Sequence, residues 1–268
     1  MDRNLKSRLT TAAIGIPLVV LLVGWSPAWL FSTVFFVLTL AALREYSVMA
    51  FREDRRQQWL AMGFGIFICA TIFAGPSDNL ALRLSVILIF CFSTYLFTAG
   101  TLTERFNRLS RTLLGGFYIG FLLPHWVLLF HYGDRRAWVF FVLLVVMAGD
   151  SSAYFIGKRF GKRKLAPILS PTKTVEGAWA YVAGSMLAGI AGMGIFSGQI
   201  SLWEIVLVSL VLSVLGQTGD LFESWIKRVF TVKDSGTFLP GHGGLLDRLD
   251  SLIFPAVFAT CYLKVFHP

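Results

Sequence analysis

Nine apolar segments run through the chain of 268 residues, and this pattern limits its possible folds more than any other feature. A helix needs roughly 20 mostly apolar residues to cross the hydrocarbon core of a bilayer, and most of the segments have about this length, although several are shorter. The segments lie near residues 11–25, 28–43, 60–75, 80–102, 113–130, 137–156, 178–197, 202–221 and 246–266. The pattern predicts an all-α, polytopic integral membrane protein with about nine transmembrane helices.

The composition excludes several other classes of protein. Apolar residues make up 56% of the chain and charged residues 15%, whereas a soluble domain has about 25% charged residues. A soluble domain of this size has too little interior to bury so much apolar surface. We therefore exclude a soluble globular protein, a disordered chain and a nucleic-acid-binding domain, although the net charge is +9.

The distribution of Lys and Arg predicts the orientation in the membrane. If the N-terminus is cytoplasmic and nine spans alternate, all but four of the 24 Lys and Arg residues belong to the cytoplasmic side. An excess of Lys and Arg in cytoplasmic loops is the usual pattern in membrane proteins. No mitochondrial presequence is visible, and a chain of this size suits a bacterial cytoplasmic (inner) membrane.

The loop lengths predict where the chemistry takes place. The expected outer loops are only a few residues long, whereas the inner loops 157–177 and 222–245 are long, polar and rich in Gly, Lys and Asp. We expect residues 1–136, with about five spans, to form a membrane scaffold. We expect residues 137–268 to form the catalytic membrane region, with its active site facing the cytoplasm.

Four carboxylates lie at the ends of apolar segments. Asp150 ends the sixth segment, Asp220 ends the eighth, and Asp247 and Asp250 open the last. Carboxylates at membrane depth are costly and usually functional, and Mg²⁺ binds one or two protein carboxylates together with water and substrate phosphates. We interpret the four as candidate ligands for Mg²⁺. The alternative is that Asp150 and Asp220 only cap helices at the interface.

Glycines and basic residues accompany these acids. Consecutive glycines in the run 240–244 let backbone N–H groups approach an anion, and the helix expected to follow adds the positive end of its dipole. The basic residues near these acids are Lys173, Lys227, Arg228 and Lys233. Together they predict a site for a metal ion and a polyphosphate, although basic residues can also reflect membrane topology alone. His242 could transfer a proton, or only donate a hydrogen bond to the backbone or a phosphate.

Two motifs resemble a known family. The first reads Ser224-x-Ile226-Lys227-Arg228, then Lys233-Asp234, then Pro240-x-His242-Gly243-Gly244-x-x-Asp247-Arg248-x-Asp250. The second reads Asp150-x-x-Ala153-Tyr154, then Gly157, Gly161 and Pro167, then Ser170-Pro171-x-Lys173-Thr174-x-Glu176-Gly177. Both resemble the signature of the phosphatidate cytidylyltransferase, or CDP-diacylglycerol synthase, family. The N-terminal half resembles this family only in hydropathy.

The resemblance implies a reaction and roles for the motif residues. The implied reaction uses Mg²⁺ and converts CTP and phosphatidate into CDP-diacylglycerol and pyrophosphate for phospholipid biosynthesis. The implied metal ligands are Asp220 and Asp247, with Asp250 and Asp150 as further candidates. The implied catalytic residues are Asp220, Asp247, Lys173, Lys227 and Arg228. The implied substrate-binding residues are Ser170, Thr174, Ser224, Lys233, Asp234, His242, Gly243, Gly244 and Arg248. The resemblance also allows a homodimer.

Three alternative functions stay open at this point. A CTP-dependent polyprenol or dolichol kinase would transfer the γ-phosphate to an alcohol and release CDP. A transporter or channel would also have many spans and intramembrane acids, but it would leave the motif over 222–250 unexplained. A structural membrane scaffold would require Asp220 and Asp247 to be dispensable.

Overall fold

The structure is a computed structural model that describes residues 15, 17–73, 79–131, 135–196, 200–236 and 243–267. Its described part is almost entirely helical, which confirms the predicted all-α class. A helix over 17–25 is followed by α2 (Ala28–Ala50), α3 (Arg55–Phe73), α4 (Leu80–Leu96), α5 (Leu102–Gly115), the π-helical turn η2 (Gly116–Phe121), α6 (His125–His131), α7 (Arg135–Phe160), α8 (Val175–Ala191), the 3-10 turn η3 (Gly192–Phe196), α9 (Leu202–Val229) and α10 (Leu246–Phe266). Two short antiparallel strands, β1 (Lys164–Ala166) and β2 (Ser170–Thr174), form a hairpin between α7 and α8.

Six of the described helical segments are long and apolar enough to cross a membrane. They are Ala28–Ala50, Leu102–His131, Arg136–Phe160, Val175–Phe196, Leu202–Val229 and Leu246–Phe266. Helix α4 is apolar but shorter. Each of the nine apolar segments contains a helix in the described part of the chain, so the polytopic class is confirmed. Nine crossings and a cytoplasmic N-terminus stay predictions.

The ends of two predicted spans differ from those in the structure. The segment 80–102 contains a helix end, because Thr101 and Glu104 form a reciprocal capping box that starts a new helix, α5. The segment 113–130 is the second part of a longer helical segment that begins at Leu102. That segment changes to a π-helical turn at η2, and Pro124, which has no N–H to donate, lies just before α6.

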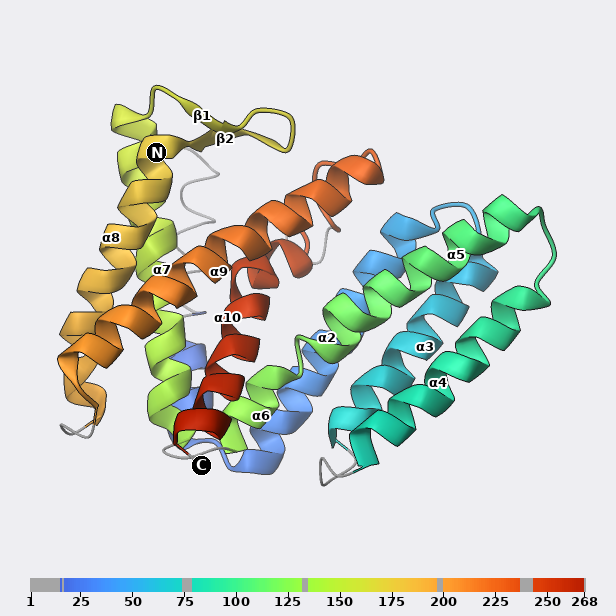
Figure 1. Cartoon of the computed structure of the whole chain (residues 1–268), viewed down its shortest axis with the longest axis horizontal. Helices are drawn as coiled ribbons and strands as arrows, with labels where there is room; N and C mark the ends of the chain where they lie inside the picture. The colour runs from blue at the N-terminus through green and yellow to red at the C-terminus, as the bar shows by residue number, and fades with distance from the viewer. Residues whose placement is uncertain are drawn as a thin grey trace.

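The helices form two groups with a central layer between them (Figure 1). Helices α7, α8 and α9 lie on one side with the hairpin at one end, and α3, α4 and α5 lie on the other side. In the centre, α2 packs against α3 and α6, and α10 packs against α6, α7 and α9. Phe31 of α2 stacks on Phe130 of α6 with ring centroids 4.1 Å apart. Tyr118 of η2 packs edge-on against Phe254 of α10 with ring centroids 6.0 Å apart, so aromatic contacts also join the N-terminal and C-terminal halves.

Small residues bring α7 and α8 close together. A side chain at Gly149 would collide with Tyr181 and Ser185, so glycine is needed at this contact. The hydroxyl of Ser185 donates to the carbonyl oxygen of Val145 at 2.9 Å. Small residues and such interhelical hydrogen bonds are typical of packing between membrane helices. The contact fixes Asp150, the next residue in α7, beside α8.

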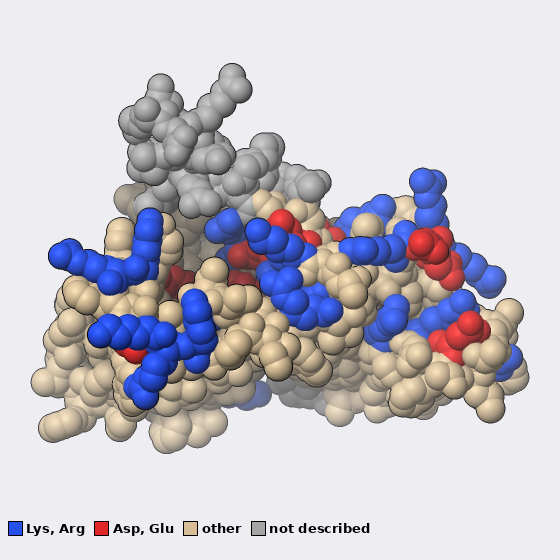
Figure 2. Space-filling model, turned by 90° about the horizontal axis from the view of Figure 1, so that it is seen from above, with Lys and Arg blue, Asp and Glu red and all other residues tan. Residues whose placement is uncertain are grey.

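The surface has one charged end and an apolar periphery. Lys and Arg side chains crowd the face seen from the end that carries the hairpin (Figure 2). By contrast, large apolar side chains are exposed around the helices, among them Trp25, Leu82, Phe90 and Trp203. Apolar surface of this extent is suited to lipid rather than water. The charged end is therefore the expected membrane–water boundary on the side that the sequence predicts to be cytoplasmic.

Candidate active site

A cavity of about 640 Å³ lies between α7, the hairpin, α8 and α9. Its lining includes Asp150, Lys173, Thr174 and Asp220, four of the residues that the sequence singled out. Asp150 precedes the end of α7 by ten residues and Asp220 precedes the end of α9 by nine. At 1.5 Å per residue, both carboxylates lie roughly 15 Å along their helices from those ends. The cavity therefore reaches from the charged end of the molecule to the depth of its apolar helices.

The start of α8 fixes the hairpin that carries Lys173. Thr174 is the N-cap of α8, and its hydroxyl accepts a hydrogen bond from the amide of Gly177 at 3.1 Å. In the first turn of α8, Glu176 accepts a hydrogen bond from the amide of Lys162 at 3.0 Å. Both contacts tie the hairpin to a rigid helix, so Lys173 is held at the cavity by ordered backbone on each side.

Glycine makes the close approach of α7 to this hairpin possible. A Cβ atom at Gly161 would lie 2.6 Å from the methyl carbon of Thr174, which is closer than real carbon atoms approach one another. Gly157 and Gly177 also pack on the Thr174 side chain. The glycines of the second motif therefore serve the packing of the hairpin against α7 and α8.

Lys173 and Asp220 form an ion pair inside the cavity. Their Nζ and Oδ2 atoms are 2.6 Å apart, and the two side chains are 24% and 32% exposed. An ion pair with this much access to solvent contributes only about 0–1 kcal/mol to stability. A phosphate group could therefore replace the carboxylate as the partner of Lys173 with little loss of stability.

Ser251 connects the other two acids to α10. Its hydroxyl donates to Asp150 at 3.1 Å, and its amide donates to Asp250 at 2.7 Å. Asp250 is buried, whereas Asp150 is half-buried and lines the cavity. The structure thus places Asp150 and Asp220 in the cavity wall and Asp250 behind it.

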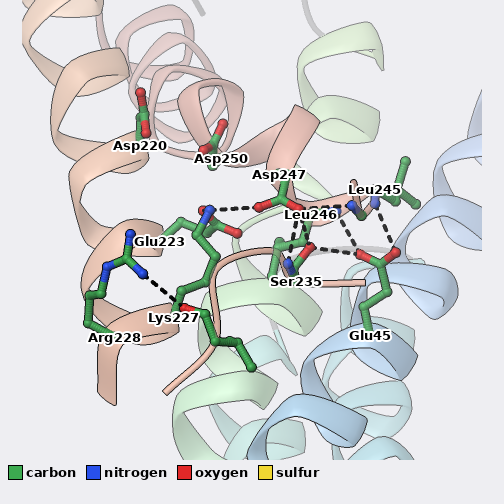
Figure 3. Close-up of polar contacts among 12 residues, drawn as sticks. Glu45, Asp220, Glu223, Lys227, Arg228, Ser235, Leu245, Leu246, Asp247 and Asp250 are labelled. Atoms are coloured by element: carbon green, nitrogen blue, oxygen red, sulfur yellow. Dashed lines mark hydrogen bonds and ion pairs between the residues drawn. The ribbon is translucent and has the colours of Figure 1, made fainter. Parts of the chain in front are cut away.

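A second group of polar residues, here called the loop cluster, consists of Glu223, Lys227, Ser235 and Asp247 (Figure 3). Lys227 forms ion pairs with both Glu223 and Asp247, and its Nζ is 2.6 Å from Asp247 Oδ1. The Glu223 side chain is completely buried, and those of Lys227 and Asp247 are 12% and 11% exposed. Since Asp220, Glu223 and Lys227 occupy successive turns of α9, this helix joins the loop cluster to the cavity.

Asp247 also organises the backbone before α10. Its Oδ2 accepts hydrogen bonds from the Ser235 amide and hydroxyl, both at 3.0 Å, and from the Gly244 amide at 2.8 Å. Gly243 has a φ of +81°, a conformation that L side chains rarely adopt. Gly243 and Gly244, the described end of the run that the sequence predicts to bind an anion, thus lie against an anionic side chain in this structure.

Arg228 contacts backbone carbonyl groups. It donates to the carbonyl oxygens of Leu169 and Val232, both at 3.2 Å, and so ties the hairpin to the turn after α9. The remaining predicted residues lie as follows: Ser170 begins β2, Ser224 is buried in α9, Lys233, Asp234 and Arg248 are exposed, and His242 lies outside the described residues. Their roles in binding substrate stay predictions.

Two residues at the site were not predicted from the sequence. Glu45 of α2 accepts hydrogen bonds from the amides of Leu245 and Leu246, each at 2.9 Å. Tyr181 of α8 is buried and lines the cavity. Glu45 lies far from both motifs in sequence. Tyr181 lies four residues after the second motif, in an apolar helix where an aromatic residue indicates packing rather than a site.

These features define a polytopic α-helical membrane protein with a charge-lined cavity at one end of its helices. The chain belongs to the Cytidylyltransferase family, whose family model matches residues 6–266. It is 42% identical over 168 residues to the phosphatidate cytidylyltransferase of Bacillus subtilis (strain 168). This alignment covers 61% of this chain and 61% of that relative. The enzymes of the same name from Staphylococcus saprophyticus and Staphylococcus aureus (strain COL) are 46% and 43% identical over 117 and 129 residues. These matches cover 44% and 47% of this chain and 45% and 50% of those relatives, so less than two thirds of each relative's length is matched.

The donor atoms in the cavity fit a magnesium ion that is bound jointly with substrate. Within the described residues, no three His, Cys, Asp or Glu side chains converge to form a metal centre on their own. Mg²⁺ normally takes one or two protein carboxylates and completes its shell with water and phosphate oxygens. Asp150 and Asp220, both carboxylates on the cavity wall, match that requirement. No softer ligands accompany them in the cavity lining, which agrees with a hard cation.

Proposed function

We propose that the protein transfers the cytidylyl group of CTP to phosphatidate, with formation of CDP-diacylglycerol and pyrophosphate. The observation that carries this proposal is the cavity in which Lys173 and Asp220 meet, at the charged end of a member of the Cytidylyltransferase family. The curated relatives named phosphatidate cytidylyltransferase support the choice of substrates. The same reaction accounts for both a lipid-facing surface and a polar cavity in one chain.

The electrostatics of the reaction match the cavity. The nucleophile is a phosphate monoester, which is largely dianionic near neutral pH because its second pKa is about 6. It needs no strong general base, but it must approach a triphosphate of the same charge sign. The main requirement is therefore a group of cations that offsets this repulsion and stabilises the pyrophosphate leaving group.

The residues of the cavity can meet that requirement. Lys173, Lys158 and Lys164 all line it and supply positive charge from three successive elements. We propose that Lys173 exchanges its ion pair with Asp220 for a substrate phosphate. The carboxylates of Asp220 and Asp150 then become available to hold Mg²⁺, which when bound would neutralise phosphate charge and assist departure of pyrophosphate.

The loop cluster is proposed to position the reactants from beside the cavity. Lys227 forms ion pairs with two carboxylates that have little or no exposure, and Asp247 fixes the amides that precede α10. The sequence-based assignment of Asp247 and Asp250 as metal ligands is retained as a proposal. It would require Asp247 to give up part of its present set of donors when metal and CTP bind.

The depth of the cavity suits substrates that arrive from different phases. Phosphatidate must keep its acyl chains in the bilayer, whereas CTP arrives from water. Tyr154 and Leu165 line the cavity and are exposed, so the cavity adjoins apolar surface as well as the charged end. We propose that this end faces the cytoplasm of a bacterial cell and that the protein resides in the cytoplasmic membrane. Assembly as a homodimer is a further proposal, which the mass of the purified particle in detergent would test.

The test is formation of lipid product by purified protein in detergent micelles. With CTP, Mg²⁺ and phosphatidate, mass spectrometry should detect CDP-diacylglycerol, and with diacylglycerol in place of phosphatidate it should not. A polyprenol or dolichol kinase would form no CDP-diacylglycerol from either lipid, since it transfers the γ-phosphate to an alcohol and releases CDP. A transporter would need a sealed compartment and would give no product in micelles. Absence of CDP-diacylglycerol from folded protein would overturn the proposal.

A further inference from the structure

We propose that Glu45, in the half of the chain that the sequence marks as scaffold, is a positioning residue that holds the loop cluster and the start of α10 in their active arrangement. The inference rests on the proposed function for its effect on catalysis. It differs from that proposal because it concerns a side chain outside both sequence motifs and outside the cavity.

The contacts of Glu45 converge on the polar loop. Its Oε1 accepts a hydrogen bond from the Leu245 amide and its Oε2 accepts one from the Leu246 amide, each at 2.9 Å (Figure 3). The first amides of a helix have no partner within the helix, and a carboxylate placed there is also favoured by the helix dipole. Glu45 therefore satisfies two amides at the start of α10, although it lies about 200 positions earlier in the chain.

Ser235 links Glu45 to the loop cluster. Its hydroxyl lies 3.2 Å from Glu45 Oε2 and 3.0 Å from Asp247 Oδ2, so the two carboxylates share one hydroxyl. Asp247 in turn forms the ion pair with Lys227. A substitution at Glu45 should therefore displace Asp247 and Lys227, although neither of these residues is itself changed.

Two glycines show that the loop is shaped around this carboxylate. A Cβ atom at Gly236 would lie 2.6 Å from Glu45 Oε1, and one at Gly244 would lie 2.6 Å from Oε2. Any larger residue at Gly236 would push the Glu45 side chain away from its donors. Gly236→Ala therefore perturbs the same contact from the opposite side and leaves the charge of Glu45 in place.

The experiment compares Glu45→Gln, Gly236→Ala and the double variant with Glu53→Gln as the matched control. Glu53 lies in the turn after α2 and is exposed. We expect kcat/KM for CTP, per mole of folded protein, to fall about 10- to 100-fold in each single variant, because a misplacement of about 1 Å can have an effect of this size. The kcat/KM of the double variant should be no lower than that of the less active single variant, since both changes disrupt the same contact. Glu53→Gln should behave as wild type.

A second measurement does not depend on activity. Hydrogen exchange of the segment 243–250 should be faster in Glu45→Gln than in wild type and unchanged in Glu53→Gln. Gln has one acceptor oxygen where Glu45 has two, so one of the Leu245 and Leu246 amides loses its acceptor. Exchange equal to wild type would overturn the inference whatever the enzyme does. If the wild type is active, a kcat/KM within about threefold of wild type in both single variants would also overturn the inference. A change of that size is what a surface substitution worth about 0.5 kcal/mol produces. If wild type forms no CDP-lipid, the proposed function fails while the exchange result still decides the role of Glu45.

Discussion

Replacement of Lys227 by Met should destabilise the protein strongly. Lys227 is the shared cationic partner of Glu223, which is completely buried, and of Asp247, which is 11% exposed. Removal of one partner from a buried ion pair typically destabilises a protein by about 3–5 kcal/mol, because an uncompensated charge stays buried. For a chain of this size, about 1 kcal/mol corresponds to roughly 2–4 °C, so we expect Tm to fall by roughly 6–20 °C.

The assay is the fraction of monodisperse protein that survives heating in detergent, followed by size-exclusion chromatography. Lys233→Met is the matched control, since Lys233 is exposed in the loop after α9, and its Tm should stay close to that of wild type. The double variant Lys227→Met/Glu223→Gln should be more stable than Lys227→Met alone, because it also removes the buried negative charge. A Lys227→Met protein as stable as the control, or a double variant less stable than Lys227→Met, would refute the reasoning.

Three further outcomes are expected from the cavity. Lys173→Met and Asp220→Asn should each lower kcat by about 100-fold or more, as loss of a group that stabilises transition-state charge does. Both should shift Tm by only a few degrees, because the two side chains of the ion pair are 24% and 32% exposed. Wild-type rates in either variant would contradict their assignment. Removal of divalent cations with EDTA should abolish product formation and addition of Mg²⁺ should restore it, so full activity in EDTA would contradict the metal proposal. Gly161→Ala should lower activity because its Cβ would collide with Thr174, whereas Gly63→Ala, which has open space, should not; equal activities would contradict the packing role of the glycine.

The hydropathy pattern predicted the fold class well, because the bilayer requires long apolar helices. Each apolar segment contains a helix in the described residues, and the helix after Gly244 begins where the glycine run ends. The hairpin was not predicted, since strands of three and five residues with two prolines nearby carry no alternating pattern. The predicted span 80–102 extends beyond the end of α4 at Leu96, because the prediction assumed the length of a full span. The capping box of Thr101 and Glu104 shows that a new helix starts there.

The site was predicted in part. Asp150 and Asp220 were identified as carboxylates at the ends of apolar segments and Lys173 as a basic residue of the polar loop 157–177, and the structure brings all three to one cavity. The ion pair of Lys227 with Glu223 was not predicted, although the two residues have the i, i+4 spacing of neighbouring side chains on a helix. Glu45 could not be found in this way, because its partners lie 190 to 201 positions away in the sequence.

The central claim is that CTP donates its α-phosphorus, with the cytidine, to phosphatidate at the cavity around Asp220. It is tested most directly by the fate of each phosphorus when the purified protein is given either α-labelled or γ-labelled CTP with phosphatidate and Mg²⁺. We predict that the α-label enters the lipid, that the γ-label leaves in pyrophosphate, and that both transfers are lost in Asp220→Asn. Entry of the γ-label into lipid with release of CDP, or undiminished transfer in Asp220→Asn, would contradict the account.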